Sequence, residues 1–594
     1  MRLPGGRGLA AAIALAILLA GCLTPAATLD ATAAPPVPDP VAPGDLAVDV
    51  LDYAFGLELF DDGRGHTFPM HLRGSLHVPE GEGPFPVLVF VHGYHGTCSY
   101  PLLPQLPWYW GNSTPGPYGA CPRASPVVEP ADSFRGYDYF SDPLASHGYV
   151  IASIDAGELN DNFFGYDWKL RGDLVLRTLD HLREANEGVG PHADALEGEL
   201  DLARIGIMGH SRGGQGVATA AVRNAERPVD ERHAIVAVLG LAPVDATSES
   251  SVVADAAYAT ILPYCDGDVW NLAGARTFDR ARYLDEARPS PKYQWLVMGT
   301  NHNQYNTAWA RNANDASWMT DPYCGRPAPE GGFLGLDDTL RIGGALMGAF
   351  FRTHVGGEEG FDAFLRGDAA PPVEACPAAP VDCASLVHVS YHPPGPDRLA
   401  IEDAATDASL SHNDVGRPSR FDGFADASWC EPRDCPAQYN TAGAAQLHLA
   451  WDGPATWSTE LGGADLSTYR WLSVRVGVNH RDARNAVDAP QEMRIVLTDA
   501  SGNAATALAS EHGGALFYPP GDGPGADVSN PTVGILSDNV FGRTDQNARV
   551  TLNELRVPLG AFAGVDLAHL QEVDFVFGDT PSGSIQVADV LAGR

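Results

Sequence analysis

The sequence predicts two folds in series: an α/β domain with a mostly parallel central sheet, and after it an all-β sandwich. From about residue 46 to 366, continuous apolar runs alternate with segments of helical periodicity. From about residue 384 onward, short runs alternate polar and apolar residues, with turn residues between them. A chain of 594 residues is also too long for one hydrophobic core, so we expect at least two domains.

The central sheet is predicted from continuous apolar runs, which are typical of strands that helices cover on both faces. These runs are residues 86–91, 149–154, 204–208, 234–239, 258–262 and 294–298. Apolar residues near helical spacing predict helices over residues 167–185, 212–223 and 339–351. We assign the α/β domain to residues 46–369.

The N-terminus has the pattern of an export signal. Arg2 and Arg7 precede an apolar run over residues 9–20, which is too short to span a bilayer stably. Residues 19–22 (LAGC) resemble the lipobox of bacterial lipoproteins, which implies cleavage before Cys22 and diacylation of its thiol. An ordinary signal peptide is the alternative. Residues 23–45 are expected to form a flexible tether, so the protein is predicted to be a cell-envelope lipoprotein or an extracellular protein.

The charge of the chain restricts its partners. The formal net charge is -37 at pH 7, which repels polyanions. Nucleic acids and anionic membrane surfaces are therefore not expected as partners. Membrane contact is expected only through the lipid anchor.

Cysteine usage agrees with export, because disulfides persist in oxidising compartments. Nine cysteines are present, and eight remain once Cys22 is set aside. Local spacing suggests three pairs and leaves the last two cysteines for each other: Cys98–Cys121, Cys376–Cys383, Cys430–Cys435 and Cys265–Cys324. The sequence leaves this connectivity open. No Cys or Cys/His cluster has the spacing of a zinc site, and we expect neither a metal nor an organic cofactor.

The character of the chain changes after residue 367. Residues 370–383 hold four prolines and two cysteines and are predicted to be a stapled linker. Short strands are then predicted at residues 446–451, 471–476, 493–497, 553–557, 573–577 and 583–590. This pattern predicts a sandwich over residues 384–594, with a jelly-roll arrangement.

The strongest chemical signal is residues 209–214 (GHSRGG), which follow a predicted strand and open a predicted helix. In this context a serine sits on a tight, strained turn, and small residues two positions before and after it leave room for its neighbours. Ser211 is therefore the candidate nucleophile. A serine hydroxyl needs a base, and that base needs a third group to orient it.

The base and the acid are expected after later strands, in the order serine, acid, histidine. His302 directly follows the last apolar strand and is the candidate general base. Asp268 follows the strand at residues 258–262 and is the preferred acid, with Asp266 as the alternative.

A tetrahedral intermediate needs two hydrogen-bond donors for its oxyanion. We expect the backbone N–H of Arg212 and that of Tyr94, in the loop after residue 91, where Gly93 keeps the backbone close to the substrate. His92 and His95 are expected to shape this loop. Two insertions, residues 97–134 and 303–326, are expected to wall the pocket. Their aromatic residues, Trp108 and Trp309 among them, line the pocket or pack the insertions; the sequence leaves both open.

These motifs give a resemblance to a known superfamily. Residues 68–366 resemble the α/β-hydrolase branch that contains platelet-activating-factor acetylhydrolases, dienelactone-hydrolase-like proteins and cutinase-like polyester hydrolases. The resemblance rests on residues 91–94 (VHGY), 144–149 (LASHGY), 209–214 and 349–357 (AFFRTHVGG), with Asp268 and His302. One departure is Arg212, because cutinase-like polyester hydrolases usually carry Met after the serine; a guanidinium there would change the polarity of the acyl site.

The resemblance implies an exported serine hydrolase of carboxylic esters, which are small, lipid or polymeric. A prolyl-oligopeptidase-type peptidase is the second hypothesis, weakened by the lack of preceding β-propeller repeats. A third hypothesis is a non-catalytic, glycan-binding surface lipoprotein. The C-terminal part resembles jelly-roll modules of secreted carbohydrate-active enzymes, and glycan or polymer binding there would need exposed aromatic residues. Four tryptophans are available for this, but core packing explains most of them equally well: Trp429, Trp451, Trp457 and Trp471.

Overall fold

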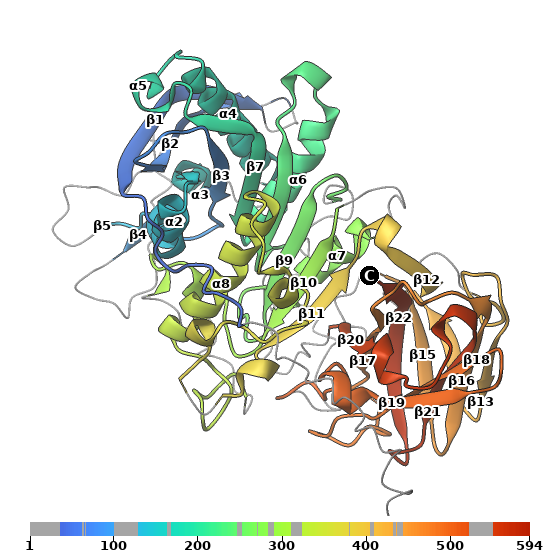
Figure 1. Cartoon of the computed structure of the whole chain (residues 1–594). Helices are drawn as coiled ribbons and strands as arrows, with labels where there is room; N and C mark the ends of the chain where they lie inside the picture. Colours follow the sequence, from blue (N-terminus) through green and yellow to red (C-terminus); the bar gives the residue numbers. More distant parts are fainter. Residues whose placement is uncertain are drawn as a thin grey trace, which may run out of the picture. The chain divides into compact units, whose positions relative to one another are not determined.

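The first part of the chain forms a nine-stranded sheet with helices around it (Figure 1). The order of strands across the sheet is β1-β2-β6-β3-β7-β8-β9-β10-β11. The strands from β6 to β10 run parallel to their neighbours, and β1, β2 and β11 pair antiparallel. The bounds are β1 Val48–Asp61, β2 Thr67–Pro79, β3 Phe85–Val91, β6 Val150–Ile154, β7 Leu200–His210, β8 Ile235–Leu241, β9 Ala257–Pro263, β10 Lys292–Val297 and β11 Val387–His392.

The computed structural model describes most of the chain. The described residues are 36–61, 65, 67–99, 129–162, 168–245, 252–269, 271–282, 290–310, 323–378, 381–403, 409–431, 435, 444–480, 482–521 and 551–594. The predicted export signal, Cys22, Trp108 and Cys121 lie outside these residues. Within the described part, no helix is long and apolar enough to cross a membrane.

Helices cover both faces of the sheet. Their bounds are α2 Asp138–Ser146, α3 Gly157–Asn162, α4 Trp168–Asn186, α5 Ala193–Leu196, α6 Arg212–Glu226, α7 Gly274–Ala281, α8 Leu336–His354 and α9 Asp362–Leu365. Short 3-10 helices lie in the connections: η1 Ser133–Tyr137, η2 Val229–Glu231, η3 Asn303–Tyr305, η5 Val373–Ala375 and η6 Cys383–Ser385. A two-stranded ribbon joins β4 (Cys98–Ser99) to β5 (Glu129–Pro130).

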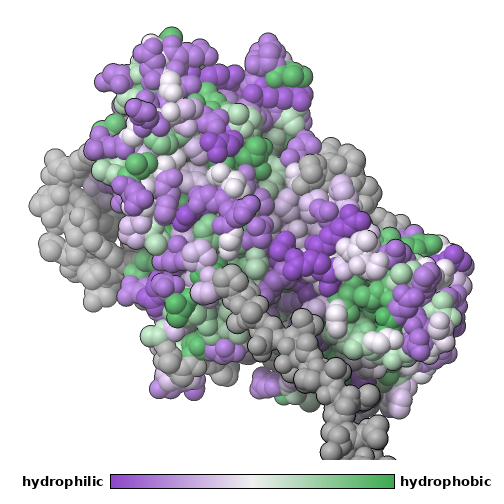
Figure 2. Space-filling view, in the orientation of Figure 1, coloured by the Kyte–Doolittle hydropathy of each residue, from purple (hydrophilic) through white to green (hydrophobic). Residues whose placement is uncertain are grey.

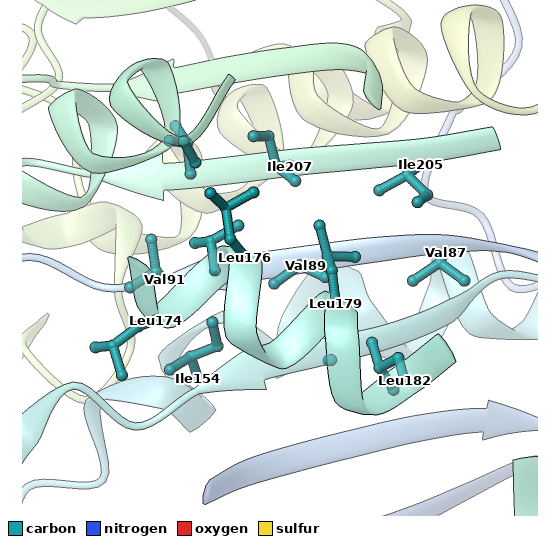
Figure 3. Packing of buried hydrophobic residues seen from close by; sticks show 14 of the residues in the cluster. Val87, Val89, Val91, Ile154, Leu174, Leu176, Leu179, Leu182, Ile205 and Ile207 are labelled. Carbon is teal, nitrogen blue, oxygen red and sulfur yellow. The ribbon is translucent and has the colours of Figure 1, made fainter. Parts of the chain in front are cut away.

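The two faces have separate cores because successive strand residues point to opposite sides of a sheet. Val87, Val89 and Val91 of β3 pack on one side with α4 and α6, whereas Leu88 and Phe90 pack on the other side with α2 and α8. Figure 3 shows the first of these cores, with leucines of α4 next to valines of β3 and isoleucines of β7. Each fully buried leucine contributes about 2 kcal/mol to this packing, so α4 is held firmly against the sheet.

The predicted sheet is confirmed in its central part. The six predicted apolar runs are the strands β3, β6, β7, β8, β9 and β10, and the three predicted helices are α4, α6 and α8. The antiparallel hairpin β1–β2 at one edge and the helices α2 and α7 lie outside the predicted bounds. The order and direction of the strands are those of the α/β-hydrolase fold.

The predicted start of the second domain at residue 384 is wrong for β11. This strand pairs with β10 along its whole length, from Lys292 opposite His392 to Val297 opposite Val387. It therefore completes the first sheet. Val387, Val389 and Tyr391 pack on the core that contains α8.

The predicted tether is also wrong at its C-terminal end. Val37 and Val41 pack against the core that contains α2 and α8, and the N–H of Gly44 donates to Ser146 Oγ at 2.7 Å. Residues 37–45 are thus part of the folded body, which extends as one unit from Val37 to Arg594.

The C-terminal part contains two antiparallel sheets, one with the order β14-β15-β22-β17-β20, to which β12 adds through β22, and one with the order β13-β16-β21-β18-β19. The bounds are β12 Arg398–Asp403, β13 Ser419–Asp422, β14 Asp426–Cys430, β15 Gln446–Trp451, β16 Ala455–Ala464, β17 Trp471–Val478, β18 Arg494–Asp499, β19 Ala504–Leu508, β20 Asn553–Pro558, β21 Leu570–Phe577 and β22 Gly583–Gly593. Short 3-10 helices are η7 Gly395–Asp397, η8 Ala509–His512, η9 Leu559–Ala561 and η10 Leu567–His569. Both sheets contribute to one hydrophobic core, as in a sandwich; the jelly-roll arrangement stays a prediction.

The tryptophans of this part are mostly core residues. Trp451 and Trp457 are fully buried and Trp471 is 5% exposed, while Trp429 is partly buried against the same core as Trp451. Hydrophilic residues cover most of the face seen in Figure 2, and hydrophobic residues are scattered among them. No exposed platform is therefore formed by Trp451, Trp457 or Trp471.

Three of the four predicted disulfides lie within the described residues: Cys265–Cys324, Cys376–Cys383 and Cys430–Cys435. Cys98 is disulfide-bonded as well, and Cys121 lies outside the described residues.

Candidate active site

Ser211 lies on a strained turn between β7 and α6. Its φ of 59° and ψ of -122° are rare for a residue with a side chain. The turn is held by neighbouring backbone groups: the N–H of Ser211 donates to Leu241 O at 2.8 Å, and its carbonyl accepts from Gly214 N at 2.9 Å. Backbone strain of this kind marks a position that the surrounding structure determines, and here it puts the serine at the carboxyl end of the central strand.

The glycines around Ser211 are required by close contacts, as the motif predicts. A Cβ on Gly209 would lie 2.0 Å from Gly213 O, and one on Gly213 would lie 2.3 Å from Val91 O. A larger residue at position 209 would push β7 away from α6, and one at position 213 would push α6 away from β3. The sequence interpretation of the small residues two positions before and after the serine is therefore confirmed.

His302 lies after β10 and is oriented by Asp266. Its Nδ1 is 2.9 Å from Asp266 Oδ2, and both side chains are almost fully buried. The other oxygen, Asp266 Oδ1, accepts from the N–H groups of Asp268 and Val269 at 2.8 and 2.7 Å. Because Nδ1 donates to the carboxylate, the opposite nitrogen, Nε2, has the acceptor lone pair of a neutral imidazole.

The preferred assignment of the acid is corrected by this geometry. Asp268 lies on the other side of the ring, with its Oδ2 4.0 Å from His302 Nε2, and its side chain is 38% exposed. The Nδ1 side of the ring is occupied by Asp266, and the backbone N–H of Asp268 donates to the other oxygen of that carboxylate. Although this side chain is partly exposed, the loss of water around its carboxylate raises the pKa of Asp268; His302 and Arg212 oppose the rise, and the Asp266 carboxylate adds to it.

The loop after β3 lies against Ser211. A Cβ on Gly93 would stand 3.1 Å from Ser211 Oγ and 2.5 Å from its Cβ, so only glycine leaves space beside the hydroxyl. The guanidinium of Arg212 lies 4.1 Å over the ring of Tyr94. Arg212 is also the first residue of α6, and the N–H groups of a first helical turn lack partners within the helix. The two predicted oxyanion donors, Tyr94 and Arg212, are thus brought to the same end of the sheet as Ser211.

His92 and His95 shape the loop, as expected. His92 donates from Nδ1 to Gly93 O and accepts from Ala156 N through Nε2, each at 2.9 Å. Burial lowers the pKa of His95 to about 3, with smaller contributions from neighbouring histidines. His95 therefore stays neutral at neutral pH and is a poor candidate for the general base.

Trp309 is not part of a pocket surface. It is fully buried, its ring stacks on His95 at 4.7 Å and lies 4.6 Å from the ring of His210, and its indole N–H donates to Ser133 Oγ at 2.8 Å. It therefore packs against two histidines next to the catalytic residues and does not line a pocket. The ring of His210 in turn lies 4.9 Å from that of His302, which places the base beside the residue that precedes Ser211.

Two further residues at this site carried no signal in the sequence. Asn160 of α3 and Arg171 of α4 are buried and bind the carbonyl groups of the loop after β3. Single polar residues in helical segments are ordinarily exposed, and only their burial reveals a role. No group of three or more His, Cys, Asp or Glu side chains arranged to hold a metal occurs among the described residues.

The fold and this constellation define an α/β-hydrolase with a serine, histidine and aspartate at the carboxyl ends of its strands. Residues 131–319 match the family model described as PETase, PET hydrolase-like. The match covers less than half of the chain, but Ser211, Asp266 and His302 all lie within it. It supports an ester hydrolase related to polyester hydrolases. A comparison with curated proteins gives no match.

Proposed function

We propose that this protein hydrolyses carboxylic esters through an acyl-enzyme on Ser211. In acylation, Ser211 Oγ attacks the ester carbonyl carbon and its proton passes to His302 Nε2. The tetrahedral intermediate then collapses, the alcohol leaves with that proton, and the acyl group stays on Ser211. Water repeats the sequence in deacylation, which releases the carboxylic acid and restores the serine.

The observation that carries this proposal is the bond from His302 Nδ1 to Asp266 Oδ2 at 2.9 Å. It selects the imidazole tautomer that can accept a proton from the serine, and it stabilises the imidazolium that forms. The two backbone N–H groups on Asp266 Oδ1 hold the carboxylate in position independently of the ring.

The oxyanion is stabilised in this proposal by the backbone N–H groups of Tyr94 and Arg212. Each donor of this kind accounts for roughly a hundredfold to a thousandfold in rate. The guanidinium of Arg212, which lies over the ring of Tyr94, gives this side of the acyl site a polar rim.

We propose a polymeric ester, of the cutin-like or synthetic polyester type, as the substrate class. The match to a PET hydrolase-like family supports this choice. Export, which is itself part of this proposal, fits the choice because polymers do not enter cells; the disulfides favour an exported protein. Attachment to the cell envelope through Cys22 remains part of the proposal, with no other membrane contact and no nucleic-acid partner. For the C-terminal part we propose a stabilising role, because most of its tryptophans lie in its core.

The experiment compares wild type with Ser211→Ala on p-nitrophenyl esters of increasing acyl length and on polyester film. We expect wild-type hydrolysis of both, and a loss of at least a thousandfold in the variant. Activity on short soluble esters without any release of acid from film would confine the function to small esters. A wild type that hydrolyses no ester would contradict the proposal.

A further inference from the structure

The loop of residues 92–96 is fixed from behind by two buried side chains. Arg171 Nη1 donates to His92 O at 2.8 Å. Asn160 Nδ2 donates to Gly93 O at 3.2 Å and to His95 O at 3.1 Å. Arg171 is fully buried and Asn160 is 4% exposed, so these bonds are shielded from water.

These contacts determine the direction of the amide groups in the loop. In a trans peptide the C=O of one residue and the N–H of the next lie in one plane and point in opposite directions. The carbonyl of Gly93 and the N–H of Tyr94 belong to the same peptide unit. Because Asn160 and His92 Nδ1 both hold the carbonyl of Gly93, the N–H of Tyr94 points to the opposite side.

The loop adjoins the nucleophile at position 93, since a Cβ there would be 3.1 Å from Ser211 Oγ. The Tyr94 N–H thus belongs to a peptide unit next to the reacting serine. By the same reasoning, Arg171 sets the peptide unit between His92 and Gly93 through the carbonyl of His92. The loop donors are thereby set before a substrate arrives, which is the condition for effective stabilisation of an oxyanion.

Arg171 also orients Asn160. Its Nη2 donates to Asn160 Oδ1, so the amide group of Asn160 has its NH₂ side turned toward the loop. The guanidinium is always charged, and in a buried, weakly polarisable environment its positive charge acts over a longer range than in water. Negative charge that develops on the substrate oxygen would form on the far side of the peptide units that Arg171 holds.

We propose that Arg171 and Asn160 are positioning residues for the oxyanion hole, which hold the Tyr94 N–H toward the ester oxygen and place a positive charge behind it. This inference rests on the proposed ester hydrolysis. It assigns a role in the transition state rather than in substrate binding, and this distinction can be measured.

The test uses the full-length protein and three variants. Arg171→Met keeps the bulk and removes the charge and the donors, Arg171→Lys keeps the charge, and Asn160→Asp keeps the shape but presents oxygens where nitrogens donate. The matched control is Arg177→Met on the same helix, where the arginine side chain is 54% exposed and pairs with Glu58. Each protein is assayed with a p-nitrophenyl ester and with an aryl boronic acid, whose tetrahedral adduct on Ser211 places an oxygen in the oxyanion hole.

We expect kcat to fall about 10- to 100-fold in Arg171→Met and Asn160→Asp with KM within about twofold. The boronic acid inhibition constant should rise by a similar factor, and Arg171→Lys should recover part of the loss. Because the two residues act through one loop, the double variant should lose little more than the worse single variant. Arg177→Met should match wild type.

Folded variants that match wild type in kcat, or that change only KM, would overturn the inference while leaving the ester hydrolysis intact. If Arg171→Met does not fold, Asn160→Asp and Arg171→Lys decide by the same criteria. A wild type that neither hydrolyses the ester nor binds the boronic acid contradicts the proposed function itself, and the inference falls with it.

Discussion

Two carboxylates approach the imidazole of His302 from opposite sides, and their surroundings give them different tasks. Asp266 is almost fully buried and binds Nδ1, while Asp268 is partly exposed and lies 4.0 Å from Nε2. The positive charge of His302 lowers the pKa of Asp268, against the larger effect of burial. Interactions between two titrating groups are reciprocal, so an ionised Asp268 stabilises the protonated imidazole.

The pH profile of the Asp268→Asn variant follows from this coupling. The variant removes a negative charge beside the imidazolium, so the base should lose its proton at lower pH. The acid limb of kcat/KM should therefore move down, by up to about one pH unit because Asp268 is partly exposed to solvent. Activity above pH 8 should stay within a few fold of wild type. Initial rates from pH 4 to 9 test this, and an acid limb that moves upward or stays in place would show that Asp268 does not act on His302.

The residue-scale error in the sequence analysis has a local cause. Asp266 and Asp268 both follow the strand at residues 258–262, and the pattern could not show which carboxylate binds the imidazole. The turn is decided by Asp266, whose Oδ1 accepts two backbone N–H groups ahead of it, as Asp side chains do in Asx turns. The order of serine, acid and histidine and the strand before each were predictable, because they depend on chain direction and hydrophobic runs.

At the scale of elements, a disulfide joins the acid to a distant segment. Cys265 directly precedes Asp266 and is bonded to Cys324, 59 residues later. Cys430–Cys435 closes a span of only 5 residues in the sandwich. A longer closed loop restricts the unfolded chain more, and only the first disulfide adjoins the active site.

Replacing both cysteines of Cys265–Cys324 by serine should cost about 2–4 kcal/mol of stability and should lower kcat. The loss of kcat is expected because Asp266 would no longer be anchored from its N-terminal side. The double serine variant of Cys430–Cys435 is the control, with a smaller loss of stability and unchanged kcat. Thermal unfolding and ester hydrolysis measure both. Equal kcat values in the two variants would show that the Cys265–Cys324 disulfide does not hold Asp266 in position.

The elements also show what a hydrophobic pattern can predict. Continuous apolar runs identified the six strands from β6 to β10 in the sheet, because a strand covered on both faces must be apolar throughout. The pattern of β11 fits the edge of either sheet: Val387 and Val389 face the α/β core, while His388 stacks on Phe517. The sheet that such a strand joins depends on the strand it meets in the folded protein. The pattern of the strand itself does not show this.

At the scale of the whole molecule, buried charges join the sandwich to the α/β part. Asp279 of α7 binds Arg475 of β17 and lies 3.5 Å from Arg282, which binds Asp589 of β22. All four side chains are at most 4% exposed. No pattern in the sequence points to this cluster, because ion pairs between residues 196 and 307 positions apart depend on how the folded domains pack.

The Asp279→Ala variant should be strongly destabilised, because it leaves two arginine charges in a buried site with less compensation. Loss of one partner from a buried ion pair costs about 3–5 kcal/mol. The control is Asp452→Ala, which breaks an exposed pair with Arg484 and should cost less than about 1 kcal/mol. Thermal unfolding of both variants compares them. Similar melting temperatures would contradict a stabilising role for the buried cluster.

Asp266, His302 and Ser211 are proposed to work together in ester hydrolysis. The most direct test is kcat for a p-nitrophenyl ester at pH 8 in Asp266→Asn and Asp268→Asn, two substitutions of the same kind two residues apart. We predict a loss of roughly a thousandfold or more for Asp266→Asn, because an amide no longer selects the required imidazole tautomer, and less than about tenfold for Asp268→Asn. A larger loss in Asp268→Asn than in Asp266→Asn would contradict the account.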